Sequence, residues 1–402
     1  MFGGEILTGT AAVIGGSIGG LFAAAALRKA GWQVQVHERV GVPLSGRGAG
    51  IVTHPQLLHA LAEVGADTSD LGVQVHDRVV FDRDGARVTT LPYPQIVTSW
   101  DRMYQTLRRL IPDDAYHLGE MLASYTEDAD GVTLHFESGA EARVDLLVGA
   151  DGFRSAVRAR LLPDVQPAYS GYVVWRALAQ EADLSPEMRD RIFDVFGMFM
   201  PQGTQIVGYP IAGENNDLRP GHRRYNFVWY FPVSQDGLTD MLTDASGTTH
   251  AISIPPPLVR DDVLAQMEET AARVLPDVFQ HVLAKSERPF FTPIYDHLSP
   301  TFAKGRVALS GDAACVARPH VGMGVTKAAQ DALALARHLG GDVSAGLQAY
   351  SAERVPLSRA AYERSQMLGR HMMQGPMQGD PMDGRHNPNM DEIIRLTAVA
   401  DF

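Results

Sequence analysis

The stretch VIGGSIGG, residues 13–20, nearly matches the G-x-G-x-x-G turn that receives a dinucleotide at the start of a helix. Gly15 and Gly20 take the first and third glycine positions, and Ser17 stands at the middle position, where the backbone comes closest to a pyrophosphate. A serine is small enough to narrow this approach without closing it, and its hydroxyl can donate to a phosphate. The turn therefore predicts a dinucleotide site.

The residues around this turn give it the context that the fingerprint needs. A short apolar run at 10–15 predicts a strand, the alanine-rich stretch 17–31 predicts a helix that ends at a glycine, and WQVQVHER, 32–39, alternates like a second strand. Glu38 follows Gly20 by 18 residues and suits the hydroxyls of a ribose, while disfavouring a 2′-phosphate. The alternative is a glycine turn in an ordinary α/β protein, with Glu38 as a solvated strand end.

Composition limits the classes of protein that remain. The 402 residues suffice for two or three domains, and 45% hydrophobic with 20% charged residues is typical of a globular chain with a large core. A net charge of −12 without a long basic run argues against nucleic acid or a membrane surface as partner. A single cysteine, Cys315, excludes an internal disulfide framework. Without a signal peptide or a long apolar run, we expect a cytoplasmic protein.

Two further motifs indicate which dinucleotide is bound. LLVGADGFRSAVRARLL, 146–162, places Asp151 and Arg158 after an apolar strand, and a second apolar strand leads into Gly311 and Asp312. Taken alone, Asp151-Gly152 and Gly311-Asp312 are common turn dipeptides. A simple NAD dehydrogenase needs neither, whereas FAD extends past the fingerprint and needs several chain segments. Asp312 at a strand end suits a ribityl hydroxyl, so the combination favours FAD.

In this order, the motifs resemble those of the single-component FAD-dependent aromatic hydroxylases, the para-hydroxybenzoate hydroxylase-like family. The resemblance extends to about residue 370 and is strongest to the branch that includes 2,6-dihydroxypyridine 3-hydroxylase. It rests on GGSIGG (15–20), ERVGVPLSGRGAGIV (38–52), YSGYVVWRA (169–177), YPIAGEN (209–215), RRYNFVWYFPV (223–233) and GDAACVARPHVGMGVTKAAQDA (311–332). By this resemblance, serine at position 17 is a feature of the branch.

Pattern and resemblance together predict an α/β fold in which a Rossmann-like FAD-binding domain is interleaved with a mostly antiparallel β-sheet substrate domain. The FAD-binding domain would comprise 1–75, 101–165 and 296–345. The substrate domain would comprise a hairpin at 76–100, turning at DRDG, and the strand-rich segment 166–295. The remaining 346–402 would form a C-terminal helix and an irregular tail.

The resemblance also implies cofactor contacts residue by residue. They would come from Gly15, Ser17, Ile18, Gly20, Glu38, Arg39 and Arg47, from Asp151 and Arg158, and from Asp312, Pro319, Gly322 and Gly324. Asp151 and Arg158 would serve both FAD and the passing nicotinamide. Two residues depart from the family pattern: Cys315 stands where a histidine is frequent, and Trp100 where many members carry an arginine that contacts FAD.

The expected reaction is hydroxylation of an electron-rich ring such as a hydroxypyridine or phenol. NAD(P)H would reduce FAD, and O2 would give a flavin hydroperoxide whose distal oxygen the ring attacks. His320, beside the expected flavin edge, is the candidate base; the alternative is that it only hydrogen-bonds backbone or caps a turn. No Cys, His or acidic cluster has metal-ligand spacing, so no metal is predicted.

The expected substrate pocket lies between the flavin and the strand-rich segment. Its candidate lining is Arg47, Tyr209, Trp175, Phe227, Trp229 and His320. Strand alternation places Phe227 and Trp229 on one face and Val228 and Tyr230 on the other. The alternative is that these aromatic residues fill the core of a sheet.

The sequence is also compatible with other functions. They are a related flavin monooxygenase that epoxidises or performs Baeyer–Villiger insertion on a larger polycyclic substrate, a non-monooxygenase NAD(P)-linked flavoprotein, and a dehydrogenase without flavin. The partners expected are a small aromatic substrate and O2, without nucleic acid or membrane. A homodimer, the choice between NADH and NADPH, and the ring hydroxylated are left open.

Overall fold

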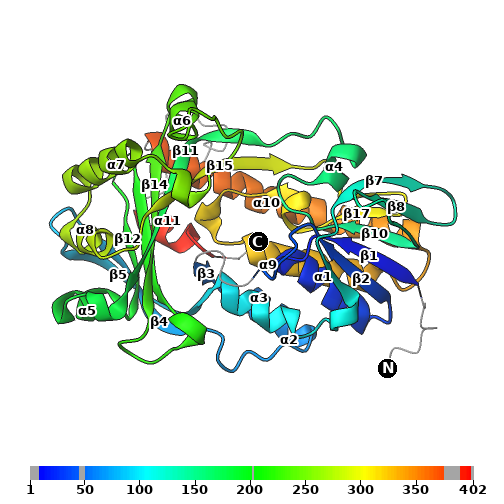
Figure 1. Cartoon of the computed structure of the whole chain (residues 1–402). Helices are drawn as coiled ribbons and strands as arrows, with labels where there is room; N and C mark the ends of the chain where they lie inside the picture. Colours follow the sequence, from blue (N-terminus) through cyan, green and yellow to red (C-terminus); the bar gives the residue numbers. More distant parts are fainter. Residues whose placement is uncertain (1–8, 45–49, 202, 375–389, 400–402) are drawn as a thin grey trace, which may run out of the picture.

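The structure is a computed structural model that describes residues 9–44, 50–201, 203–374 and 390–399. Two lobes are visible in Figure 1, one built on the strands near β1 and the other on the larger sheet that contains β11 and β14. The predicted fold class, an α/β protein with a Rossmann-like unit and a mostly antiparallel second sheet, is confirmed. In the part of the chain that the structure describes, no helix is long and apolar enough to cross a membrane.

The first sheet follows the expected βαβ start. Its strand order is β16-β17-β10-β1-β2-β6, parallel except at the β16 edge. The strands are β1 (Thr10–Ile14), β2 (Gln33–Glu38), β6 (Tyr116–Leu118), β10 (Leu146–Gly149), β16 (Ala303–Lys304) and β17 (Val307–Leu309). The carboxyl ends of parallel strands meet at one edge of a sheet, which is where α/β proteins bind ligands.

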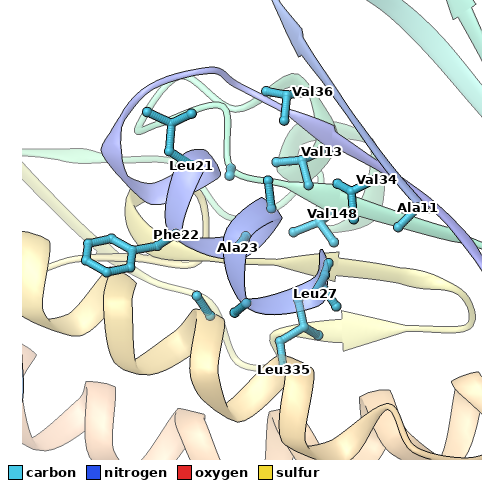
Figure 2. Close-up of a cluster of buried hydrophobic side chains, with 14 of the residues drawn as sticks. Ala11, Val13, Leu21, Phe22, Ala23, Leu27, Val34, Val36, Val148 and Leu335 are labelled. Carbon is cyan, nitrogen blue, oxygen red and sulfur yellow. The ribbon is translucent and has the colours of Figure 1, made fainter. Parts of the chain in front are cut away.

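Helices and a small sheet surround this first sheet. The helices are α1 (Ile18–Lys29), α2 (Pro55–Glu63), α3 (Trp100–Arg108), α4 (Ala156–Leu161), α9 (Gly324–His338) and α10 (Val343–Gln374). The small sheet consists of β7 (Leu122–Glu127), β8 (Val132–Phe136) and β9 (Glu141–Val144). Figure 2 shows part of this core, where Leu27 of α1 lies next to Leu335 of α9, and Val13, Val34 and Val148 come from neighbouring strands. The alanine-rich face of α1 allows this close packing.

The larger sheet has the strand order β18-β15-β11-β14-β13-β12-β4-β5-β3 and is antiparallel except where β12 pairs with β4. Its strands are β3 (Gly50–Val52), β4 (Val73–Phe81), β5 (Arg87–Ser99), β11 (Ala168–Gln180), β12 (Val195–Phe199), β13 (Gln205–Ile211), β14 (Arg224–Pro232), β15 (Phe290–Leu298) and β18 (Cys315–Val316). β3 and β18 come from segments that the sequence places in the FAD-binding domain, so the two lobes interleave. The domain boundaries themselves stay a prediction.

Each face of the larger sheet is covered. One face packs against α5 (Pro186–Ile192), α6 (Gln235–Met241), α7 (Asp261–Val274) and α8 (Asp277–Ala284), which lie on the side away from β1 in Figure 1. The other face looks toward the first lobe and carries Tyr172, Val174, Tyr209, Val228 and Tyr230. It also contacts α11 (Met390–Leu396), drawn in red in Figure 1.

The described residues of the C-terminal segment form two helices. α10 continues to Gln374, and α11 begins at Met390. The middle of the tail that the sequence predicts to be irregular lies outside the described residues. The described part of this segment therefore consists of a long helix, α10, and a short helix, α11, that contacts the larger sheet, and the irregular tail stays a prediction.

The glycines of VIGGSIGG set how closely α1 approaches β1. Gly15 has φ +108°, which favours glycine, and a Cβ on Gly20 would lie 1.8 Å from the carbonyl oxygen of Gly15. A Cβ on Gly19 would meet Ala328 at an ordinary 3.6 Å. Only one of these two neighbouring glycines is therefore required by packing.

We expect Gly20→Ala to destabilise the protein, because the helix must move off the strand to make room for the methyl group. Overpacking of this kind costs about 1–3 kcal/mol, so the midpoint of thermal unfolding should fall by roughly 1–4 °C for a chain of this size. Gly19→Ala is the matched control and should leave the midpoint unchanged or slightly raised. Equal midpoints for the two variants would contradict the close approach.

Candidate active site

A cavity of about 680 Å³, here called the nucleotide cavity, lies at the carboxyl ends of β1, β2 and β10. The first predicted motif contributes Gly15, Ser17, Ile18, Glu38 and Arg39 to its wall. The other two motifs contribute Asp151, Asp312 and Gly324. Segments far apart in sequence thus meet around one cavity, whose volume suits an organic cofactor.

The turn before α1 presents free donors to this cavity. Ser17 is the N-cap of α1, and its hydroxyl caps no backbone N–H in the described structure. The first N–H groups of a helix have no intrahelical partner and carry the positive end of the helix dipole. A glycine turn, an available hydroxyl and a helix N-terminus are together the donor set that suits a pyrophosphate.

Glu38 fixes the shape of the same turn. Its Oε2 accepts from the backbone N–H of Gly16 at 2.8 Å, and its Oε1 accepts from the N–H of Val40 at 2.9 Å. The Tyr116 hydroxyl donates to the carbonyl of Gly16 at 2.8 Å. Carboxylate oxygens can accept more than one hydrogen bond, so Glu38 can still receive a ribose hydroxyl. Gly20 lies behind this turn and acts through packing rather than as part of the wall.

Asp151 and Arg158 have different positions, although both come from the second motif. Asp151 lines the nucleotide cavity, and its Oδ2 accepts from the N–H groups of Ala156 and Val157 at 2.7 and 3.2 Å. Its Oδ1 has no partner among the residues that the structure describes, and burial raises the pKa of the carboxyl group. An unsatisfied buried oxygen beside the cavity suits a ligand hydroxyl.

Arg158 is buried outside the cavity wall. It donates to the carbonyls of Phe153 and Ala313 at 2.5 and 3.2 Å, and its NH1 lies 2.8 Å from Nε2 of His297. The expected direct cofactor contact is therefore corrected: Arg158 joins the second motif to the Gly311–Asp312 turn from behind. The sequence could not separate these two positions, because both fall in one short helix start.

The Gly311–Asp312 turn rests on a buried charge network. Asp331 accepts from the N–H of Gly311 at 3.0 Å and from Nζ of Lys327 at 3.2 Å, and Nε of Arg354 donates to it at 2.8 Å. Lys327 also donates to the carbonyl of Gly311 at 2.8 Å. Both backbone groups of Gly311 are thereby fixed. Burial raises the pKa of the neighbouring Asp312.

A second cavity of about 360 Å³, here called the sheet cavity, lies against the inner face of the larger sheet. Its wall includes Tyr209, Val228 and Tyr230 of the sheet together with Pro319, His320 and Gly322. Asp312, Gly324 and Val325 line both cavities. The two cavities therefore meet beside the start of α9.

Only some of the predicted substrate contacts line the sheet cavity. Tyr209 does, whereas Trp175, Phe227 and Trp229 pack in the core on the opposite face, against the side that carries α7 and α8. Trp229 is fully buried there and its Nε1 donates to Oγ1 of Thr204 at 2.6 Å. Their assignment to the pocket is thus corrected, and the alternative of a sheet core is right for them. Arg47 lies outside the described residues.

His320 lines the sheet cavity but has both ring nitrogens engaged. Nε2 lies 2.9 Å from the Tyr172 hydroxyl and Nδ1 lies 2.9 Å from Oε1 of Gln205, while the ring stacks on Tyr230 with centroids 4.4 Å apart. Burial, together with the nearby Arg318, lowers the pKa of His320 to about 3. The imidazole is therefore neutral at ordinary pH.

Sequence reasoning missed Arg176 and Gln205, which also line the sheet cavity. The alternation that groups Val228 with Tyr230 also groups Arg176 with Tyr172 and Val174 on β11. This pattern identifies shared faces, but it does not say which face borders the cavity. Arg176 is the polar member of an otherwise apolar and aromatic run, which was the available signal.

The C-terminal segment contributes Thr397 and Ala398 to the wall of the sheet cavity. The fully buried guanidinium of Arg78 donates to the carbonyls of Ile394, Thr397 and Ala398 at 2.8, 2.5 and 2.9 Å. The N–H of Ala398 in turn donates to the carbonyl of His320 at 2.9 Å. Arg78 thus holds the end of α11 in place next to His320.

The two residues that depart from the family pattern have clear positions. Trp100 lines the nucleotide cavity and stacks on Tyr104, with ring centroids 5.2 Å apart. Cys315 is buried, and burial raises the pKa of its thiol to about 12. The thiol is therefore protonated and inert. Within the described ranges, no group of three or more His, Cys, Asp or Glu side chains could hold a metal ion.

A Rossmann-like sheet with a dinucleotide turn, open to a cavity against a second sheet, defines a dinucleotide-dependent enzyme. Residues 169–296 match a family model described as FAD binding domain-like. The chain is 32% identical over 392 residues to 2,6-dihydroxypyridine 3-monooxygenase of Paenarthrobacter nicotinovorans. The aligned region covers 96% of this chain and 98% of that protein. This chain belongs to the FAD-dependent monooxygenases that hydroxylate aromatic rings, as its motifs predict.

Solved structures agree with this assignment. The structure of 2,6-dihydroxypyridine-3-hydroxylase from Arthrobacter nicotinovorans matches with a TM-score of 0.87 and 31% identity, over 96% of this chain and 99% of that chain. Klebsiella pneumoniae HpxO complexed with FAD and uric acid matches with a TM-score of 0.74 and 26% identity, over 93% of this chain and 90% of that chain. FAD is the cofactor of this chain, and NAD(P)H is its co-substrate.

We expect Ser17→Leu to weaken FAD binding by at least about 10-fold, because an isobutyl group at the helix start obstructs the approach to the backbone donors. Ser17→Gly is the matched control and should keep FAD bound. The measurement is the FAD-to-protein ratio from visible absorbance after gel filtration. A fully yellow Ser17→Leu protein would place the pyrophosphate elsewhere.

Proposed function

We propose that this chain hydroxylates a small electron-rich heteroaromatic ring of the hydroxypyridine type, with NADH or NADPH as electron donor. The observation that carries the proposal is the sheet cavity, which borders the nucleotide cavity at Asp312, Gly324 and Val325. Its volume of about 360 Å³ is at the lower end of the roughly 300–1,000 Å³ usual for ligand pockets. A single ring suits it better than a polycyclic substrate.

We also propose how the cofactor is held. The Ser17 hydroxyl and the N–H groups at the start of α1 would bind the pyrophosphate, and Glu38 would receive the ribose. Asp312 and the start of α9 at Gly324 would border the ring, since they line both cavities. Bound FAD supplies the redox chemistry with NAD(P)H and O2, while the protein supplies position and charge.

The sheet cavity would orient the substrate and exclude water. Val207, Val228 and Ile294 give it an apolar wall, and Thr397 and Ala398 close part of it from the C-terminal side. Exclusion of water strengthens each polar interaction made inside and suppresses side reactions. The clamp that Arg78 makes on these C-terminal residues therefore contributes to the environment of the reaction.

We propose that His320 positions the wall of the cavity rather than removing a proton from the substrate. Its two nitrogens are already engaged by Tyr172 and Gln205, and its lowered pKa makes it a weak base.

The reducing setting suggested by a single cysteine, and a homodimer, also stay predictions. A cytoplasmic location is proposed on the same ground and on the need for NAD(P)H.

The pH dependence of His320→Gln tests this role. We expect its single-turnover hydroxylation rate to fall by less than about 100-fold and to keep the pH midpoints of the unmodified protein, because a base typically contributes about 10²–10⁴-fold. A larger fall with loss of one limb of the profile would instead identify His320 as the base.

The pH dependence of protein stability independently tests whether His320 is neutral in the folded protein. The folded pKa of about 3 lies below the ordinary 6.5, so the unfolded chain takes up the proton first on acidification. His320 therefore costs stability as the pH falls from 6.5 toward 3. The difference in thermal midpoint between the unmodified protein and His320→Gln should shrink between pH 7 and pH 5.

A substrate panel tests the function itself. We expect hydroxypyridines to stimulate NAD(P)H oxidation and to be hydroxylated, whereas polycyclic phenols should do neither. Product must be scored beside NAD(P)H oxidation, because uncoupled turnover consumes NAD(P)H and releases peroxide. Turnover of polycyclic substrates in preference to single rings would favour the alternative of a larger substrate.

A further inference from the structure

Arg176 lines the sheet cavity and has no partner among the residues that the structure describes. It lies on β11 on the same face as Tyr172 and Val174, and it lines the cavity half-buried. Its guanidinium makes no hydrogen bond or ion pair with any residue in the described ranges. Three arginines close to the site differ: Arg158, Arg318 and Arg354 each donate to a carbonyl or a carboxylate. A half-buried cation facing a cavity without an acceptor is costly unless a ligand provides one.

Two further donors face the same space. The hydroxyl groups of Tyr209 and Tyr230 form no hydrogen bond to another part of the described chain, and both residues line the cavity. Arg176 is close enough to each to act on its pKa, although burial dominates and raises the pKa of Tyr230 to about 12. Both hydroxyls therefore stay protonated and available to donate.

On the side formed by the larger sheet, the described wall of the sheet cavity carries positive charge only. The acidic residue in its described wall is Asp312, which lies at the opposite end, where the nucleotide cavity begins. His320 is neutral, because burial lowers its pKa to about 3. Among the described residues, the sheet side thus offers one cation and two neutral donors and no anion.

We propose that Arg176, flanked by the hydroxyls of Tyr209 and Tyr230, binds an anionic oxygen of the aromatic substrate. The substrate class is thereby narrowed to rings that carry an ionised hydroxyl or a carboxylate. This inference rests on the proposed function, because it assigns the substrate to the sheet cavity. Guanidinium and an oxyanion form charge-assisted hydrogen bonds, which are about twice as strong as neutral ones.

The experiment compares matched anionic and neutral ligands on the FAD-loaded protein by isothermal titration calorimetry. One pair tests the ring hydroxyl, 2,6-dihydroxypyridine against 2,6-dimethoxypyridine, and the other tests the carboxylate, 4-hydroxybenzoate against 4-hydroxybenzamide. We expect one anionic member to bind at least about 10-fold more tightly than its neutral partner. The pair that shows this preference identifies the source of the anionic oxygen.

The variants separate charge from packing. Arg176→Met should abolish the preference by weakening the anionic ligand about 10- to 100-fold and leaving the neutral one unchanged. Arg176→Lys should retain part of the preference for the anionic ligand. Tyr230→Phe should lower the affinity for the anionic ligand by a smaller factor than Arg176→Met does. Arg87→Met is the matched control on the same sheet, because Arg87 is exposed and donates to the carbonyl of Arg191. FAD content and circular dichroism verify that each variant is folded.

The outcomes distinguish this inference from the proposed function. If the unmodified protein hydroxylates a hydroxypyridine but Arg176→Met binds anionic and neutral ligands as before, the anion site is wrong and the function stands. If the charge preference depends on Arg176 but no ring is hydroxylated, the anion site stands and the function fails. Absence of binding by all four ligands would overturn the anion site for both sources of the oxygen.

Discussion

Both cavities depend on the carboxylate of Asp331, which is fully buried on α9. Burial alone would raise its pKa, but Lys327 and Arg354 outweigh this effect and hold the pKa below its usual value. The ionised group then fixes the N–H of Gly311, while Lys327 fixes its carbonyl. Loss of one partner of a buried ion pair typically costs about 3–5 kcal/mol. The network therefore locks α9, α10 and the Gly311–Asp312 turn into one arrangement, and that arrangement forms the wall where the cavities meet.

The parts of the fold that the sequence could predict are those with local causes. The βαβ start depends on glycines at a turn and on alternation within single strands, and β1, α1 and β2 follow the expected segments closely. The hairpin at DRDG is similarly local, since the N–H of Asp82 donates to the carbonyl of Ala86 and the N–H of Gly85 donates to that of Asp82. These signals are read within a few residues, and tertiary contacts reinforce them.

The parts that could not be predicted depend on partners far along the chain. Alternation correctly grouped Phe227 with Trp229, but both faces of the larger sheet are covered, so apolarity did not reveal which face borders the cavity. Arg78 is similar, because its charge is satisfied by carbonyls of residues 394–398 rather than by an acid. Backbone carbonyls carry no sequence signature, and thus nothing in the composition of the tail shows that it closes the sheet cavity.

Burial at the wall of the sheet cavity explains the neutrality of His320 and supports the role proposed for Arg176. Removal of water penalises the protonated imidazole, whose contacts with Tyr172, Gln205 and Tyr230 offer no negative charge in compensation. The same removal of water lowers the local dielectric, which strengthens the attraction between a guanidinium and an oxyanion. An arginine keeps its charge in such surroundings, whereas a histidine loses it. In the proposed binding mode, Arg176 is therefore the residue that stabilises the anionic oxygen of the substrate, while His320 stays neutral.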